Sequence, residues 1–340
     1  MTLAEVVLAV MFVGLVAYGL FGGADFGAGI WDLLAGGSRR GARQRELIEH
    51  SIAPVWEANH VWLIFVLVVL WTAFSGAFAA IVTTLYVPLT LAAFGMIARG
   101  AAFAFRKSTT TLGMRRLLGA AFAFSSLVTP YFLGSVVGAV ASGRVPAGIA
   151  AGDVVSSWLN PTSALGGVLA VLVCAYLAAV FLCADARREG AEDLVRQFRA
   201  RALGTAAVTG AVGLAGLFVL RADAPQLFDG LTGRAAPVVA LSVVAGLAAL
   251  ALLWTGRYGA ARAASGLAVT AILVGWAVAQ YPYVLLPEVT IEEAARGRAT
   301  LVAVLVALAA GAVVLVPALV YLYVLFQRAP TEAPARSGAG

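Results

Sequence analysis

Nine long apolar runs divide this chain, and they constrain its fold more than any other feature. A run of about 20 apolar residues can cross the hydrocarbon core of a bilayer as a helix, in which the backbone satisfies its own hydrogen bonds. Only 12% of the 340 residues are charged, about half the share in an average soluble domain. The sequence therefore predicts an all-α integral membrane protein, with a single transmembrane domain over residues 1–328. We expect its helices at roughly 3–35, 54–72, 76–98, 117–140, 160–184, 203–220, 236–254, 263–283 and 300–326.

The first apolar run is too long for one span, and it is rich in glycine toward its end. Gly22, Gly23, Gly27 and Gly29 indicate either close packing or a break in the helix. We expect helices one to four and five to eight to form two four-helix bundles, with the ninth helix at the periphery. Residues 329–340, rich in Pro, Ala, Gly and Ser, are expected to form a disordered cytoplasmic tail.

The 23 lysines and arginines are distributed unevenly between successive connections. Odd-numbered connections and the tail hold 18 of them, whereas even-numbered connections hold only five: Arg144, Arg221, Arg234, Arg296 and Arg298. Cytoplasmic connections carry the excess of basic residues in membrane proteins. This alternation predicts that the amino terminus lies outside and the carboxyl terminus in the cytoplasm.

Two carboxylates are candidate functional residues, because an ionisable group inside a membrane span is energetically costly. Asp25 and Glu57 are both expected near the cytoplasmic ends of their helices. Such a pair could pass protons inward, since burial makes the neutral form of a carboxyl group accessible. The alternative is that both lie at the headgroup level, where they cap helix ends or pair with the arginines of residues 39–45.

Polar and aromatic residues are concentrated at the start of the second helix, namely Trp56, Glu57, Asn59, His60 and Trp62. His60 is the one histidine inside an expected span. A heme in a helical bundle takes a histidine and a second His, Met or Cys ligand. Because the methionines lie mostly at span ends, we expect no heme to be bound wholly by this chain. The two tryptophans are most simply explained as interfacial residues, although Trp56 could also face a cofactor on another chain.

Other chemical motifs are missing from the sequence. Cys174 and Cys183 lie nine positions apart in one apolar run, so we expect two buried thiols, no disulfide and no metal site. No glycine-rich phosphate loop, no paired histidines with metal spacing and no Ser/His/Asp arrangement occurs. From its residues alone, the chain is a scaffold, a passive pathway or a transporter.

Several stretches resemble subunit II of cytochrome bd-type quinol oxidases, the cyanide-insensitive branch included. Residues 51–63 are similar to the family's most specific motif, Pro-x-Trp-Asp/Glu-Gly-Asn-x-Val-Trp-Leu. Residues 23–29 resemble the first-helix signature, and residues 99–106 resemble the exit of the third helix. Asn160-Pro161 and the segment 281–290 are similar to later landmarks. The similarity runs in order along nearly the whole chain.

This resemblance implies a heme-free subunit of a respiratory quinol:oxygen oxidoreductase in a bacterial plasma membrane. It implies that hemes b and d and the quinol site lie on a partner, subunit I. This chain would then stabilise subunit I and conduct cytoplasmic protons through Asp25 and Glu57. Trp56, Asn59, His60 and Trp62 would hold the helix junction or face subunit I, and Arg99 and Arg106 would anchor the cytoplasmic side. A structural quinone, small accessory subunits and membrane lipid are further partners that the family admits.

The chain also departs from the family pattern. Phe21 stands one helical turn before Asp25, and Ala104 in the third-helix exit, at positions where relatives carry acids. Ala58 replaces the motif glycine, and His60 replaces Glu or Gln. These changes argue against a long acid-lined path and leave a short or shared one. Two other hypotheses stay open: a secondary transporter with its site between Asp25, Glu57 and His60, and a purely structural subunit.

Overall fold

The computed structural model describes residues 1–37, 41–52, 56–106 and 111–327, without some side chains near the ends of these ranges, Trp56, Glu57 and Arg106 among them. Fourteen α-helices, one π-helical segment and a two-stranded antiparallel hairpin make up the described chain. The elements are α1 (Leu3–Ala17), η1 (Tyr18–Gly22), α2 (Gly23–Leu33), α3 (Ala42–Ile52), α4 (Trp56–Ala73), α5 (Ser75–Thr84), α6 (Tyr86–Arg106), α7 (Leu112–Ala141), α8 (Pro161–Arg188), α9 (Glu192–Asp223), α10 (Pro225–Thr232), α11 (Ala236–Trp254), α12 (Tyr258–Gln280), β1 (Tyr283–Leu285), β2 (Val289–Thr290), α13 (Ile291–Ala294) and α14 (Arg298–Gln327).

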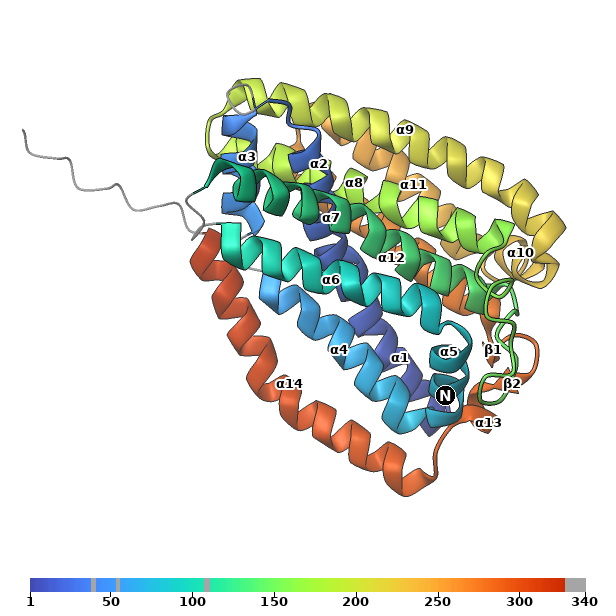
Figure 1. The fold of residues 1–340 in the computed structure, drawn as a ribbon. Coiled ribbons are helices and arrows are strands. Elements are labelled where there is room, and N and C mark those ends of the chain that lie inside the picture. The colour runs from blue at the N-terminus through green and yellow to red at the C-terminus, as the bar shows by residue number, and fades with distance from the viewer. Residues whose placement is uncertain (38–40, 53–55, 107–110, 328–340) are drawn as a thin grey trace, which may run out of the picture.

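The all-α membrane fold is confirmed. Within the described ranges, eight helical segments are long and apolar enough to span a membrane, and the bent pair α4–α5 raises the number to nine. The long helices run side by side as one bundle, with α8 near its middle (Figure 1). Consistent with that position, 61% of the most apolar stretch of α8 is buried inside the protein, whereas only 6% of the corresponding stretch of α14 is buried. α14 lies at the periphery, as expected of the ninth span.

The first span is one continuous rod of α1, η1 and α2, with a π-helical turn in the middle. The glycines near its end serve close packing. A Cβ on Gly27 would overlap the backbone oxygen of Cys174, so α2 and α8 approach at backbone distance. Small residues allow this approach, which favours association of helices in a membrane. Of the two explanations for these glycines, close packing is the one observed. The helix changes its winding at η1 but does not break.

The expected third span, 76–98, is wrong in its boundaries. The chain turns by 118° between α4 and α5, and the membrane-crossing helix α6 begins only at Tyr86 and continues to Arg106. Phe74, with φ −132° and ψ 49°, has left the helical region at this turn, and its side chain is fully buried. A break between residues 72 and 76 was expected, but hydropathy does not show that α5 ends at Thr84, because the apolar run continues through Leu85 into α6. The shift places Arg99 inside a span instead of beyond one.

The remaining boundaries differ mainly at the polar ends of helices. α9 begins at Glu192, eleven residues before the expected start at 203, because its first three turns are polar and lie at the basic end of the bundle. The short helices α3 and α10 were not expected, since hydropathy windows for membrane spans pass over short helices. The tail, residues 329–340, lies outside the described residues.

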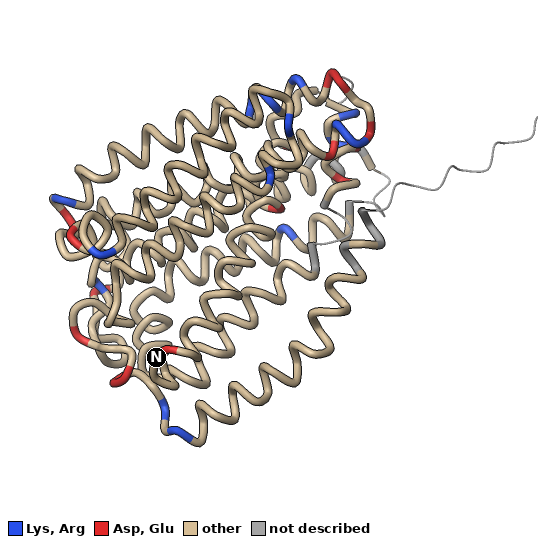
Figure 2. The backbone as a smooth tube through the Cα atoms, turned by 180° about the vertical axis from the view of Figure 1, so that it is seen from behind, with Lys and Arg blue, Asp and Glu red and all other residues tan. Residues whose placement is uncertain are grey.

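The two ends of the bundle differ in charge. Most of the described Lys and Arg residues gather at the end that carries α3, with acidic residues among them (Figure 2). There Arg43 pairs with Asp193 at 2.6 Å, which joins α3 to α9. The opposite end holds the amino terminus, the hairpin and a bidentate pair of Arg144 with Asp223, whose oxygens lie 2.6 and 3.1 Å from the guanidinium. Asn160 caps α8 beside this pair by accepting a hydrogen bond from the Ser163 amide at 2.9 Å.

Candidate functional site

A buried ion pair lies at the contact between α2, α6 and α7. The Nη2 atom of Arg99 donates to Oδ1 of Asp25 at 2.7 Å and to the Asp25 backbone oxygen at 2.8 Å. Both side chains are 2% exposed. Removing two charges from solvent is costly, and a close, hydrogen-bonded pair offsets that cost. The pair therefore places two charged groups in the interior of the bundle.

Aromatic rings and a hydroxyl group complete the surroundings of Arg99. Its guanidinium lies over the ring of Phe122 at 4.2 Å and over the ring of Phe26 at 5.0 Å. Its Nη1 atom donates to Ser126, whose hydroxyl in turn donates to the Phe122 backbone oxygen at 2.6 Å. A cation over an aromatic face contributes about 0.5–2 kcal/mol, more when water is excluded. These contacts hold Arg99 in one orientation toward α2.

One oxygen of Asp25 has no hydrogen-bond partner among the described residues. Its Oδ2 atom is buried and unbonded there, whereas Oδ1 is bound by Arg99. A buried carboxylate oxygen without a donor is costly, and it is a place where a proton or a water molecule can be held. Asp25 is thus both an ion-pair partner and an acceptor with a second oxygen to offer.

The pair lies well inside the membrane-spanning part of the bundle. Ser126 is at the middle of the 30-residue α7. Arg99 stands seven residues before the end of α6, roughly 10 Å along a helix with a 1.5 Å rise per residue. The expectation that Arg99 anchors the cytoplasmic surface is therefore corrected: its guanidinium is buried against Asp25. Asp25 likewise pairs within the bundle, whereas Arg43 pairs with Asp193 and Arg45 lies 3.3 Å from Asp32.

Glycine allows α2 to carry Asp25 into this position. A Cβ on Gly29 would overlap the Ser126 hydroxyl oxygen and would lie 2.7 Å from Nη1 of Arg99. Gly27, two residues earlier on the same helix, packs its backbone against Cys174 of α8. The glycines that follow Asp25 in the sequence therefore let α7 and α8 pack closely around it.

The start of α4 packs against the same region. Asn59 is 2% exposed, and its Nδ2 atom donates to the Phe21 backbone oxygen in η1 at 3.3 Å, while its Oδ1 atom has no partner among the described residues. The His60 ring packs edge-on against Phe26, with ring centroids 6.3 Å apart. Trp62 packs against the cluster of Tyr18, Phe26 and Cys174. Asn59, His60 and Trp62 are thus brought to the junction between α4 and the first span.

Three of the expected site residues cannot be placed in the same way. The side chains of Trp56, Glu57 and Arg106 lie outside the described residues, so the relation of Glu57 to Asp25 remains a prediction. Ala104, where relatives carry an acid, is exposed. Cys174 and Cys183 are free, buried thiols, as expected, and no group of three metal-ligating side chains forms within the described ranges.

The sequence reasoning missed the partners of Asp25. Arg99 is 74 positions away, and Phe122 and Ser126 follow in the next helix. One signal was available: residues 91–98 directly before Arg99 are an unbroken run without a polar side chain. An arginine in that setting needs a buried counter-charge, and Asp25 was the main candidate.

Comparison with known proteins identifies the family. The family model of cytochrome bd terminal oxidase subunit II matches residues 3–326. The chain belongs to this family. A solved structure of bd oxidase from Geobacillus thermodenitrificans contains a chain that superposes with a TM-score of 0.71 and 26% identity, over 96% of this chain and 99% of that one.

Two curated proteins that are similar to this chain come from Bacillus subtilis. The cytochrome bd ubiquinol oxidase subunit 2 is 29% identical over 170 residues, which is 50% of this chain and only 48% of that protein. The putative cytochrome bd menaquinol oxidase subunit II is 22% identical over 321 residues, 92% of each chain. The similarity to the first relative is therefore confined to about half its length, whereas the second aligns almost throughout.

His60 lies beside a small buried cluster of Tyr18, Phe26 and Cys174 and packs against its Phe26 ring. Met96, a residue type that can ligate heme iron, packs against the same Phe26 cluster, a position that the sequence did not reveal. Trp62 packs against this cluster as well.

Proposed function

We propose that this chain is the heme-free subunit II of a quinol:oxygen oxidoreductase and that it supports a subunit I that carries hemes b and d. The match of the subunit II family model over residues 3–326 carries this proposal. The named relatives are a ubiquinol and a putative menaquinol oxidase subunit, so a quinol is the proposed electron donor of the complex. In this assignment the chain lies in a bacterial cytoplasmic membrane, and subunit I performs the redox chemistry.

The isolation of α14 supports a partner chain. Its first turns pack against α1 and α4 through Leu301, Val304, Leu305 and Leu308. From residue 309 to residue 318 every side chain is exposed. α4 likewise exposes Ile64, Val68 and Trp71. Helices of a bundle gain van der Waals contacts by packing, so we place the contact with subunit I along α4 and the free part of α14.

The proposed contribution to chemistry is proton uptake at Asp25, assisted by Glu57. Reduction of oxygen to water consumes protons, and a chain of polar groups must bring them into the membrane interior. Asp25 is buried within a span, and its Oδ2 atom is available to accept a proton. Asn59 and His60 contact the same part of the first span from α4. The departures at Phe21 and Ala104 favour a short path shared with subunit I.

The test is oxygen consumption by the purified complex with Asp25→Asn or Glu57→Gln. Both substitutions remove a proton-accepting oxygen at nearly constant shape. We expect turnover to fall at least about 10-fold, a smaller loss than removal of a general acid or base usually causes. The heme content should stay normal. Wild-type turnover in both variants would contradict proton uptake through these residues.

A second variant separates proton transfer from a purely structural role. The contact with Arg99 also supports a structural role for Asp25. Asp25→Asn alone leaves Arg99 buried without a counter-charge, so its effect is ambiguous. The double variant Asp25→Asn with Arg99→Gln removes both charges. If Asp25 transfers protons, the double variant assembles with heme and remains slow. Recovery of turnover in the double variant would show that Asp25 acts only as the partner of Arg99.

A further inference from the structure

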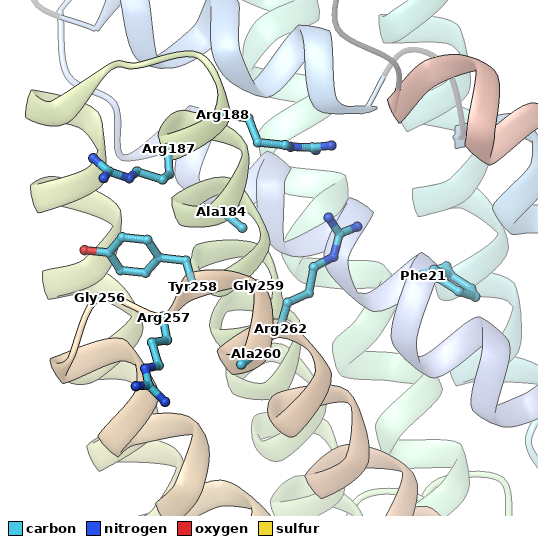
Figure 3. A pocket seen from close by; sticks show the side chains of 10 residues that line it. All are labelled: Phe21, Ala184, Arg187, Arg188, Gly256, Arg257, Tyr258, Gly259, Ala260 and Arg262. Atoms are coloured by element: carbon cyan, nitrogen blue, oxygen red, sulfur yellow. The ribbon is translucent and has the colours of Figure 1, made fainter.

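A second polar region, separate from Asp25, lies at the arginine-rich end of the bundle. It is a pocket of about 950 Å³ between the last turn of α8, the start of α12 and Phe21 of η1. Arg187, Arg188, Arg257 and Arg262 line it. Figure 3 shows Arg188 and Arg262 on the side nearer to Phe21, and Arg187 and Arg257 on the other side of the α8 end. The pocket thus combines a basic mouth with an apolar wall.

The charges in this pocket are only partly compensated. Asp185 pairs with Arg188 and lies 3.6 Å from Arg262, and Glu192 pairs with Arg187. No carboxylate of the described residues forms an ion pair with Arg257. Within the described part of the chain, Arg188 and Arg262 share the carboxylate of Asp185, and Arg257 forms no ion pair, so the pocket offers guanidinium donors to an anion.

The backbone adds to the positive potential. Gly256, with φ +77°, forms the turn before α12, and Gly259 and Ala260 in the first turn of this 23-residue helix line the pocket. First-turn amides lack partners within the helix, and the helix dipole favours an anion near them. Gly259 has no atom within 4 Å of an added Cβ, so the space in front of the backbone is open. Arginine side chains and free amides are the donors that phosphate oxygens prefer.

The apolar part of the pocket identifies the source of the phosphate. Phe21, Ala184 and Ala260 form its wall. Leu267 and Val274 follow Ala260 at seven-residue intervals on α12 and are exposed, so an apolar strip continues from the pocket along the span. A free inorganic phosphate would gain nothing from such a strip, whereas acyl chains would lie on it. Basic pockets between helices at the cytoplasmic face suit anionic lipid headgroups.

We propose that this pocket binds the phosphate headgroup of an anionic phospholipid, with the acyl chains along α12. The lipid would connect the end of α8 to the start of α12 at the membrane surface and reach Phe21 of η1 within the span. None of the four arginines belongs to the Asp25 site, so the binding is independent of proton uptake.

The experiment titrates the delipidated complex in detergent with phosphatidylglycerol and counts bound lipid by native mass spectrometry. In wild type we expect one tightly held phosphatidylglycerol. The double variant Arg188→Gln with Arg257→Gln should bind it roughly 25-fold more weakly, from about a factor of five per arginine. The matched control, Arg221→Gln with Arg298→Gln, removes two exposed arginines at the opposite end and is expected to bind as wild type does. Oxygen consumption should be unchanged in both.

Three results would overturn the proposal. Equal retention of phosphatidylglycerol by wild type and the Arg188/Arg257 variant would show that the pocket is not the site. Equally tight binding of phosphatidylcholine with the same acyl chains would exclude recognition of the anionic headgroup. Displacement of the lipid by millimolar inorganic phosphate would indicate a free-phosphate site. If the glutamine variant fails to assemble, Arg188→Lys with Arg257→Lys keeps both charges and must retain binding within about threefold.

Discussion

At the scale of residues, the Asp25–Arg99 pair dominates the interior. The sequence singled out Asp25 because a carboxylate in an apolar run is conspicuous, but it placed Arg99 at the surface. The reason is physical: an ion pair between positions 25 and 99 depends on how α2 and α6 approach each other, and a single sequence contains no measure of that approach. The same holds for Phe122 and Ser126, which are ordinary helix residues until Arg99 lies between them.

The pair makes a stability prediction. Arg99→Met leaves the Asp25 carboxylate buried without its partner, a change that typically costs about 3–5 kcal/mol. We expect the thermal midpoint of the purified complex to fall by several degrees, or assembly to fail. Arg221→Met, at an exposed arginine of the opposite end, is the control and should be neutral within about 0.5 kcal/mol.

A double variant checks the cause of that loss. Asp25→Leu with Arg99→Met replaces both charged groups by apolar ones, which is often neutral or stabilising for a buried pair. We expect its thermal midpoint to lie above that of Arg99→Met alone. A double variant as unstable as the sum of the two single variants would show that the charges do not interact in the folded protein.

At the scale of elements, hydropathy found the spans and missed their shape. Each span is predictable because its length and apolarity are local properties. The 118° angle of the turn expected between residues 72 and 76, the second break at Leu85 and the π-helical turn at Tyr18–Gly22 are not, because they depend on the packing of neighbouring helices. The glycine-rich end of the first span could be interpreted correctly in part, since glycine permits close approach whichever helix comes near.

That close approach can be tested at Gly27. In Gly27→Ala, the new Cβ would overlap the Cys174 backbone oxygen, and a backbone atom cannot move aside as a flexible side chain can. Forced overpacking typically costs about 1–3 kcal/mol or more, so we expect a lower thermal midpoint and reduced turnover, because α2 carries Asp25.

The control for Gly27 is Gly210→Ala on α9, where an added Cβ has no atom within 4 Å. There alanine should be neutral or stabilise by up to about 1 kcal/mol, since glycine is the poorer helix former. If Gly27→Ala behaved like Gly210→Ala, the α2–α8 contact would be looser than the structure has it.

At the scale of the whole molecule, the nine expected spans give the correct architecture even though several boundaries moved. The alternation of basic connections survived these errors because a shift of a few residues rarely moves an arginine across the membrane. Arg99 is the exception, and its burial removes one basic residue from the second connection expected in the cytoplasm without changing the sign of the alternation. The orientation of the bundle therefore remains a prediction that rests on many residues together.

The orientation can be tested with a membrane-impermeant maleimide on whole cells. The native thiols Cys174 and Cys183 are buried, so background labelling should be low. Ala151→Cys lies exposed in the connection between α7 and α8, and Glu189→Cys lies exposed in the turn between α8 and α9, at opposite ends of α8. With the amino terminus outside, cysteine at 151 should be labelled in intact cells, and cysteine at 189 only after permeabilisation. The reverse pattern would invert the bundle, and with it the cytoplasmic assignment of the arginine pocket.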